Sequence, residues 1–306
     1  MRAVLIENPR STAAGAVDRG RVLRALGTVC DIEAIETAGR GHAWEIAAAA
    51  RAAGAQLVVI LGGDGTVNEA IQGLLEPSLP GEAPMLGVLP AGATNVFARA
   101  IGLPNDVARA CATLVEAVWQ GRTRVIGLGK ADDRWFTFAA GFGLDAAVVG
   151  AVERRRRSGA QSSPILYARA SLRAYRWARL RGAQITLSRP GHQDLGELAM
   201  AVVTNTAPWT YLYSRPLNPT PQASFDSGLD VYARSSLGAL GLGWAMAQIS
   251  RGRAAPRGRG VAVLHDVAEL TLTASEPLPH QVDGDFLGLR RSIRLSAHPA
   301  ALRVLC

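Results

Sequence analysis

The stretch Leu57-Val-Val-Ile-Leu-Gly-Gly-Asp-Gly-Thr-Val-Asn-Glu-Ala70 decides how the first half of this chain is interpreted. Its apolar start, Leu57–Leu61, predicts a buried strand, and the residues from Val67 onward predict a helix. The turn between them is rich in glycine, which lets a backbone approach a polyphosphate closely and adopt positive φ. Its amides and the helix N-terminus favour anions. We therefore expect a phosphate-binding loop at Gly62–Asn68.

Asp64 is unusual in such a loop, because a carboxylate repels phosphate groups unless a cation lies between them. We predict that Asp64 faces Mg²⁺, directly or through water. The alternative is a purely structural strand-to-helix turn in which Asp64 or Thr66 is the N-cap. The loop alone leaves both interpretations open.

The lysine-containing P-loop is excluded by composition. That motif needs a lysine followed by Ser or Thr after its glycines, and Lys130 is the only lysine in the chain. No G-x-G-x-x-G segment opens a helix after the first strand either. Phosphate charge must therefore be met by backbone amides, Mg²⁺ and arginine.

Around this loop, the first 125 residues alternate between short apolar strands and helices. Further strands are predicted at Ala3–Ile6, Val29–Ile35 and Met85–Leu89, and further helices at Trp44–Ala53 and at Asn105–Gln120 with Asn105 or Asp106 as its N-cap. This alternation predicts a Rossmann-like parallel sheet covered on both faces. Ligands of such sheets bind at the carboxyl ends of the strands, where both glycine-rich loops begin.

From about Val125 the pattern changes to strands with few helices between them. Strands are predicted at 124–128, 135–140, 183–188, 197–205, 229–233, 261–264, 269–273 and 293–296, with helical insertions at Pro164–Leu180 and Leu237–Ser250. We expect a nucleotide-binding α/β domain at residues 1–125 and a mostly antiparallel, sandwich-like lipid or substrate domain at 126–306. The last ~15 residues can pack back on the first domain, and we expect the nucleotide site in the cleft between the domains.

Composition limits the cellular setting. No apolar run approaches the length that crosses a bilayer, and Met1–Ile6 does not resemble a secretion signal. We expect a cytoplasmic protein, with peripheral contact at the inner membrane face left open. Cys30, Cys111 and Cys306 show no metal-ligand spacing and no disulfide framework, so we interpret all three as structural or incidental.

The formal net charge is +8, and its arginines cluster in the second half, at 154–157, at Arg169, Arg173 and Arg176, and at 251–259. A basic face suits nucleic acid, anionic lipid or a phosphate-bearing substrate. No nucleic-acid module is visible, so lipid headgroups or phosphates are the expected partners.

The two predicted helical insertions have interfacial character. In Pro164–Leu180 the arginines lie on one stripe and Ile165, Ala168, Leu172 and Tyr175 on another, with Tyr167 and Trp177 as amphipathic rings. Leu237–Ile249 is almost wholly apolar. One interpretation is docking on anionic lipid, with an apolar cleft that admits an acyl chain. The other is that both helices simply cover the sheet of the second domain.

Taken together, the motifs resemble those of the diacylglycerol kinase catalytic family, which includes bacterial lipid kinases and the sphingosine and ceramide kinases. GGDGTVNEA at Gly62–Ala70 resembles the family signature. Other segments follow in the family's order: Asn8–Thr12, Leu86–Arg99 with Gly102–Pro104, Gly141–Ala146, Asp226–Asp230 and Asp283–Asp285. The resemblance spans Ile6 to Leu287 and implies an NAD-kinase-like first domain and an ATP- and Mg²⁺-dependent lipid kinase.

The resemblance also implies nucleotide-binding roles. It places ATP against Asn8, Ser11, Thr12 and Thr37, and the phosphates against Gly62, Gly63, Asp64, Gly65, Thr66, Asn68, Glu69, Gly92, Thr94 and Asn95. The family has Gly-Thr-x-Asn in the second loop, whereas this chain has Gly92-Ala93-Thr94-Asn95. Either a phosphate contact is lost there, or Thr94 supplies it from a different backbone.

Carboxylates near the C-terminus are the candidates for chemistry, because phosphoryl transfer to a hydroxyl needs a proton acceptor. Asp283 and Asp285 straddle a glycine, and i and i+2 side chains of a β segment point the same way. By resemblance Asp285, where the family has Glu, is the acceptor and Asp283 a close second or metal partner. The alternative is an Asp-Gly hairpin turn. The catalytic candidates are thus Asp285, Asp283 and Asp64.

Two further aspartates have open roles. Asp226 resembles a structural Mg²⁺ ligand, against the alternative of an Asx turn. Asp145 either orients the substrate hydroxyl or caps a strand.

We expect a kinase of diacylglycerol or a related lipid. The alternatives are a kinase of a soluble substrate, since NAD kinases carry a Gly-Gly-Asp-Gly loop, and a catalytically weak lipid-binding regulatory protein. Expected partners are a lipid and an anionic membrane surface, with no nucleic acid and a homodimer left open.

Overall fold

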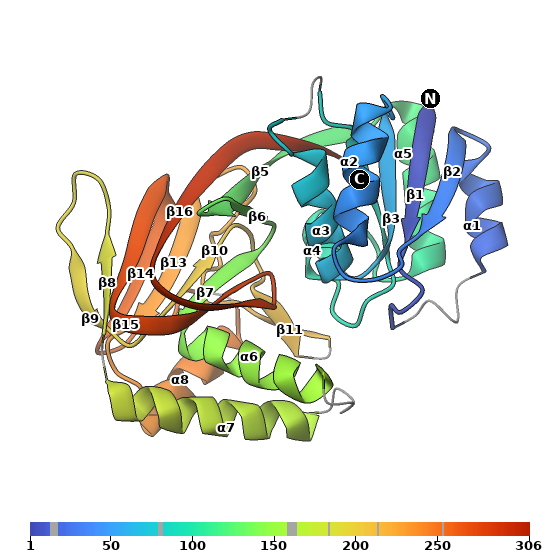
Figure 1. Cartoon of the computed structure of the whole chain (residues 1–306). Coiled ribbons are helices and arrows are strands. Elements are labelled where there is room, and N and C mark those ends of the chain that lie inside the picture. The colour runs from blue at the N-terminus through green and yellow to red at the C-terminus, as the bar shows by residue number, and fades with distance from the viewer. Residues whose placement is uncertain (13–17, 79–81, 158–163, 183, 213, 253) are drawn as a thin grey trace. The chain divides into compact units, whose positions relative to one another are not determined.

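The computed structural model describes residues 1–12, 18–78, 82–157, 164–182, 184–212, 214–252 and 254–306 (Figure 1). Within its helices, the side chains at 156, 157, 164–168, 170 and 181 lie outside the described part, and these include Ile165, Tyr167 and Ala168 of the predicted stripes. The chain forms two compact units: unit 1 is Met1–Gly127 with Ala300–Cys306, and unit 2 is Leu128–Pro299. The boundary lies two residues after the expected one, and only Ala300–Cys306 return to unit 1.

Unit 1 is built on a parallel sheet with the strand order β4-β3-β1-β2. Its strands are β1 (Arg2–Glu7), β2 (Asp31–Glu36), β3 (Leu57–Gly62) and β4 (Met85–Pro90), and Val304 of β16 pairs beside β4. Every residue of β3 is buried, as its apolar run predicts for a strand covered on both faces.

The helices of unit 1 are α1 (Arg19–Leu26), α2 (His42–Ala52), α3 (Asp64–Leu74), α4 (Val96–Ala100) and α5 (Val107–Gln120). α2 packs beside α3, and α1 beside α5 (Figure 1). The Asp106 side chain accepts a hydrogen bond from Arg109 N, so Asp106 is the N-cap of α5. The pattern missed α1, which is rich in arginine, and α4, which is a single short turn of helix.

Unit 2 is a mostly antiparallel sheet with the order β14-β13-β10-β7-β15-β16, to which β5 with β6 and β8 with β9 are joined. The strands are β5 (Thr123–Ala131), β6 (Arg134–Phe136), β7 (Ala139–Gly143), β8 (Ile185–Ser188), β9 (Leu195–Leu198), β10 (Met200–Thr204), β13 (Leu229–Arg234), β14 (Val261–Val267), β15 (Glu269–Val282) and β16 (Asp285–Leu305). β11 (Thr210–Leu212) and β12 (Arg215–Leu217) pair separately. The predicted fold class, a parallel α/β region followed by a mostly antiparallel region, is confirmed.

The β15–β16 hairpin is much longer than the predicted strands 269–273 and 293–296. Glu276, Pro277 and Pro279 interrupt the apolar pattern of β15, and register shifts occur between Thr273 and Leu278 and between Pro279 and Gln281. A strand predicted from alternating apolar residues ends where the alternation is interrupted, whereas the real strand continues through the irregularity.

Three helices cover one face of the unit 2 sheet: α6 (Leu144–Arg157), α7 (Pro164–Arg181) and α8 (Ala239–Ile249). Successive residues of β10 alternate between two cores, with Met200 and Val202 in the core beneath the helices and Ala201 and Val203 in the other. Both expected insertions are helices. α6 was missed because 154–157 was interpreted only as a basic cluster.

Among the described residues, no helix combines the length and the apolar character needed to cross a membrane. All three cysteines are free, and Cys30 and Cys111 are buried.

Candidate functional site

The two glycine-rich loops of unit 1 touch each other at Gly63 and Gly92. A Cβ atom on Gly92 would lie 2.6 Å from Gly63 Cα and 2.7 Å from Asn95 Oδ1. Ala91 N donates to the Gly62 carbonyl oxygen at 2.9 Å, which extends the β3–β4 pairing into the loops. Any side chain at Gly92 would push the loops apart, so this contact requires glycine.

Gly65 has the opposite environment. A Cβ atom there would meet no protein atom within 4 Å, although Gly65 lies in the first turn of α3. The N-cap of α3 is Gly63, which offers no side-chain cap. Because the first amides of a helix lack intrahelical acceptors and favour anions, the backbone at Gly65 is open to a phosphate group.

One prediction about this loop is wrong. None of Gly62, Gly63 and Gly65 adopts positive φ. Glycine is needed for close approach instead: a Cβ atom on Gly62 would lie 2.9 Å from Thr66 Cβ.

The Asp64 carboxylate caps α4. Its Oδ2 accepts a hydrogen bond from Val96 N and its Oδ1 one from Phe97 N, both at 3.0 Å. The N-cap of α3 is Gly63, so the alternative in which Asp64 or Thr66 is the N-cap of this helix is wrong. The carboxylate instead ties the first glycine loop to the second. A Mg²⁺ role for Asp64 stays a prediction.

Asn95 closes the second loop on itself. It adopts a left-handed conformation with φ of 52°, its Oδ1 accepts from Gly92 N at 2.9 Å, and its Nδ2 donates to the Gly92 carbonyl oxygen at 2.9 Å and to Asn105 Oδ1 at 2.8 Å. Asn95 is buried, so its contacts are with protein groups. Thr94, by contrast, is partly exposed at the tip of this loop.

The residues after β1 lie beside the first loop. Asn8 Nδ2 donates to Thr66 Oγ1 at 2.8 Å, and Asn8 Oδ1 accepts from Arg10 N at 3.0 Å. Ser11 Oγ is buried and has no hydrogen-bond partner among the described residues, and its contact with ATP stays a prediction. Thr12 is exposed, and Thr37 N donates to the Glu7 carbonyl oxygen at 2.8 Å.

Asn68 and Glu69 of the Gly62–Ala70 segment both form hydrogen bonds with other protein groups. Asn68 is 1% exposed, and its carbonyl and side-chain oxygens accept from Gln72 Nε2 at 3.3 and 3.2 Å. Glu69 Oε2 accepts from Gly41 N at 2.9 Å, which ties α3 to the start of α2. A phosphate contact of Asn68 and Glu69 stays a prediction.

In unit 2, Asp283 and Gly284 form the two-residue turn between β15 and β16, with φ of 48° and 82°. The Asp283 carboxylate is buried and accepts four hydrogen bonds: from Thr137 N at 2.7 Å, Thr137 Oγ1 at 2.8 Å, Phe138 N at 3.0 Å and Ala139 N at 3.1 Å. Burial raises the pKa of Asp283, and these hydrogen bonds oppose the rise. Asp283 is thus an anchor for residues 137–139 within an Asp-Gly hairpin turn.

Asp285 is the accessible member of the pair. Its side chain is 25% exposed, and its Oδ2 lies 3.3 Å from Arg134 Nη2. The basis for expecting that Asp283 and Asp285 point the same way does not hold, because Asp283 lies in a positive-φ turn rather than in a strand. The two carboxylates therefore contact different groups.

Asp145, in the first turn of α6, is linked to the same turn. Its Oδ2 accepts from Gln281 Nε2 at 2.8 Å, and Gln281 Oε1 accepts from Gly284 N at 2.8 Å. A Cβ atom on Gly141 would lie 1.9 Å from Asp145 Oδ2, so Gly141 provides the space for this carboxylate. Burial raises the pKa of Asp145 to about 6, although the Gln281 hydrogen bond lowers it. The Gly141–Asp145 motif thus creates a carboxyl whose pKa lies well above the ordinary value for aspartate.

We expect Asp145→Asn to change the pH dependence of stability. Because the pKa of Asp145 rises from 3.8 unfolded to about 6 folded, the folded protein retains a proton that the unfolded chain loses. This favourable contribution is complete below pH ~4 and is lost as pH rises through ~6, an effect of about 2–3 kcal/mol. Urea unfolding of both proteins at pH 4.5, 6 and 7.5 measures the difference. Parallel pH profiles would contradict the assignment.

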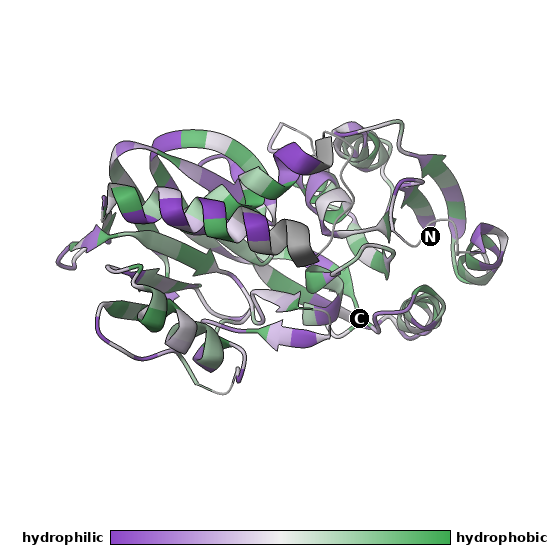
Figure 2. Cartoon of the chain, turned by 90° about the horizontal axis from the view of Figure 1, so that it is seen from below, coloured by the Kyte–Doolittle hydropathy of each residue, from purple (hydrophilic) through white to green (hydrophobic). Residues whose placement is uncertain are grey.

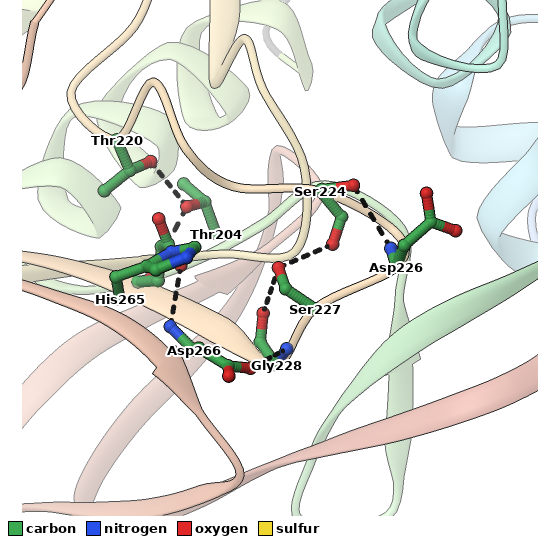
Figure 3. Close-up of polar contacts among 9 residues, drawn as sticks. Thr204, Thr220, Ser224, Asp226, Ser227, Gly228, His265 and Asp266 are labelled. Atoms are coloured by element: carbon green, nitrogen blue, oxygen red, sulfur yellow. Dashed lines mark hydrogen bonds and ion pairs between the residues drawn. The ribbon is translucent and has the colours of Figure 1, made fainter.

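Asp226 lies in a turn that Ser224 organises (Figure 3). Ser224 Oγ accepts from Asp226 N at 3.2 Å, and the Ser224 carbonyl oxygen accepts from Ser227 N at 3.1 Å. The Asp226 carboxylate points away from these groups, so this is not an Asx turn. Asp230, of the same motif, is buried and its Oδ1 lies 2.7 Å from His265 Nδ1.

The described residues contain no group of three or more His, Cys, Asp or Glu side chains that could hold a metal ion. Mg²⁺ binding by Asp226 stays a prediction that rests on one exposed carboxylate.

Comparisons with known proteins bear on this geometry. The profile of the diacylglycerol kinase catalytic domain matches residues 2–131. A diacylglycerol kinase of Mycobacterium tuberculosis is 33% identical over 162 residues, 51% of this chain and 50% of that protein. An uncharacterized protein of Synechocystis is 27% identical over 238 residues, 77% of this chain and 51% of that protein. The chain therefore spans about half the length of these relatives.

A solved structure shares the fold. The crystal structure of a diacylglycerol kinase from Bacillus anthracis matches with a TM-score of 0.71 and 17% identity, covering 99% of this chain and 96% of that one. Residues 2–131, which carry both glycine-rich loops, are thus similar to the diacylglycerol kinase catalytic domain.

Proposed function

We propose that this protein is an ATP-dependent lipid kinase that phosphorylates a hydroxyl of diacylglycerol or a related lipid. The observation that carries the proposal is the contact between Gly63 and Gly92, braced by Asp64, beside an α3 N-terminus whose backbone is open at Gly65. Kinases of this family use ATP, and such a backbone suits a polyphosphate.

Backbone amides and hydroxyls take the role that a lysine has in a P-loop. Lys130 lies in unit 2, with its Nζ 5.1 Å from the centroid of the Trp135 ring. In unit 1 the proposed donors are the first-turn amides of α3, the Ser11 hydroxyl, which has no partner among the described residues, and the partly exposed Thr94 at the second loop. Thr94 is our candidate for the contact that the family places one position earlier.

We propose that Mg²⁺ binds together with the nucleotide. In proteins this ion is commonly held by one or two carboxylates together with substrate phosphates and water. Both oxygens of Asp64 accept amide hydrogen bonds, and the described residues hold no group of three or more potential ligands, so we propose that the ion arrives bound to ATP. When bound, the ion neutralises phosphate charge.

Asp285 is the proposed proton acceptor for the lipid hydroxyl. It is partly exposed, whereas Asp283 is buried and fully engaged in hydrogen bonds. Asp145 is linked to the same turn through Gln281, which supports a proposed role in orienting the acceptor. An Asp in place of the family's Glu shortens the reach of the base by one methylene.

The test is transfer of label from [γ-³²P]ATP to dioleoylglycerol in mixed micelles, with sphingosine, phosphatidylglycerol and NAD in parallel. We expect a labelled lipid that Mg²⁺ chelation abolishes. Transfer to NAD alone would overturn the lipid assignment. Lipid binding without any turnover would instead favour a regulatory protein on the same fold.

A further inference from the structure

The outer side of α8 is an apolar surface that the protein leaves uncovered. All eleven residues of α8 are uncharged, and its inner side packs through Ala245 and Ile249 into the core beneath the helices. On the outer side, Leu240 is 93% exposed, Trp244 60% and Met246 44%. A helix that is apolar all round is normally buried or in contact with lipid.

A basic loop is attached to this helix. The Gln248 side chain holds it with two hydrogen bonds, accepting from Arg257 N at 3.0 Å and donating to the Arg257 carbonyl oxygen at 3.0 Å. Arg251, Arg257 and Arg259 are exposed there. The loop therefore presents guanidinium groups beside the exposed apolar side chains.

α7 covers the same face of the unit 2 sheet, because Ala174 and Ala178 enter the same core as Ile249. Its outer side exposes Leu172 and Leu180 between exposed arginines, namely Arg169, Arg173, Arg176 and Arg179. Figure 2, which views the chain from below, shows α7 alternating between hydrophilic and hydrophobic colour. Gln248 is the one strongly polar residue of α8.

The charge of these segments is of one sign. Residues 154–193 contain ten arginines and residues 235–264 contain four, and neither stretch contains an Asp or Glu. A protein partner of ordinary surface composition gains little from such uniform charge, whereas anionic headgroups above an apolar layer match both features.

We propose that the outer faces of α7 and α8 dock on an anionic lipid bilayer, with Leu240, Trp244 and Met246 inserted and the arginines on headgroup phosphates. The inference rests on the proposed function in one respect: a lipid kinase has to reach a membrane to find its substrate. The surface itself is defined by exposure and charge, so its test needs neither ATP nor turnover.

Co-sedimentation of the full chain with vesicles tests the proposal. We expect binding to phosphatidylcholine vesicles that contain about one third phosphatidylglycerol, and weak binding to phosphatidylcholine alone. Trp244→Ser and Leu240→Ser should each weaken binding about tenfold, and Arg257→Gln about fivefold, with loss of its effect at high salt. Trp119→Ser is the matched control, since Trp119 is 81% exposed on α5 of unit 1.

Circular dichroism and thermal unfolding of each variant separate a surface effect from misfolding, and Leu240 is so exposed that its replacement costs little packing. Equal binding by wild type, Leu240→Ser and Trp244→Ser would overturn the proposal. The proposal would also be overturned if the wild type bound no vesicles and instead formed a dimer that Trp244→Ser dissociates. Vesicle binding without lipid phosphorylation would contradict the proposed function but would still support this docking surface.

Discussion

Replacing Asp283 by Ala is expected to destabilise unit 2 by roughly 3–5 kcal/mol, because it leaves buried donors without acceptors. Three backbone amides and the Thr137 hydroxyl all donate to this carboxylate. The turn itself also loses a residue that tolerates its positive φ of 48°. Urea unfolding followed by tryptophan fluorescence measures the loss.

Asp283→Asn serves as the control for the turn. Asn tolerates positive φ and favours a two-residue turn before glycine, so this variant keeps the backbone and loses only part of the acceptor capacity. We expect an intermediate loss of stability. A change below about 1 kcal/mol for Asp283→Ala would mean that residues 137–139 find other acceptors, and the anchoring role would be wrong.

The largest catalytic effect is expected from Asp285→Asn. If Asp285 accepts the proton of the lipid hydroxyl, its amide replacement should lower kcat for phosphoryl transfer by ~10²–10⁴-fold. Stability should change little, because the side chain is partly exposed and the Arg134 contact at 3.3 Å is long. ATP binding, measured by calorimetry, should remain at the wild-type level.

Glu269→Gln is the matched control on the same hairpin. Glu269 Oε2 lies 2.8 Å from Arg294 Nη2, so this variant also removes a carboxylate from a partly exposed arginine pair. It should leave kcat unchanged. Comparable losses in both variants would show that activity follows hairpin electrostatics and not a proton acceptor at Asp285.

Short-range sequence features predicted the nucleotide-binding half well. The apolar run Leu57–Leu61 and the glycines after it give β3, its loop and α3, because a buried strand leaves a continuous apolar signal. Asp106 likewise marks the start of α5 by its own side-chain chemistry. In both cases the residues that carry the signal also make the local structure.

Roles that depend on distant partners could not be predicted. The residues that Asp64 and Glu69 contact, Val96, Phe97 and Gly41, lie at least 28 positions away in the chain. Asp283 faces residues 137–139 across almost half the sequence. The sequence shows that a carboxylate is present, but only the fold shows whether that carboxylate faces amides of the protein or open space.

Gly65→Ala tests whether a main-chain cradle, with no lysine, holds the phosphates of ATP. The added methyl group meets no protein atom within 4 Å, and the position is helical without positive φ, so the fold should keep or gain stability, by up to ~1 kcal/mol. The methyl group would, however, occupy the open space at the cradle. Gly243→Ala in α8, equally free of contacts, is the control.

The measurement is the Kd for ATP·Mg by isothermal titration calorimetry, with the Tm of each variant alongside. We expect Gly65→Ala to bind ATP at least about tenfold more weakly at an unchanged or higher Tm, while Gly243→Ala binds as the wild type does. Wild-type affinity in a well-folded Gly65→Ala protein would mean that the backbone at Gly65 does not hold the phosphates.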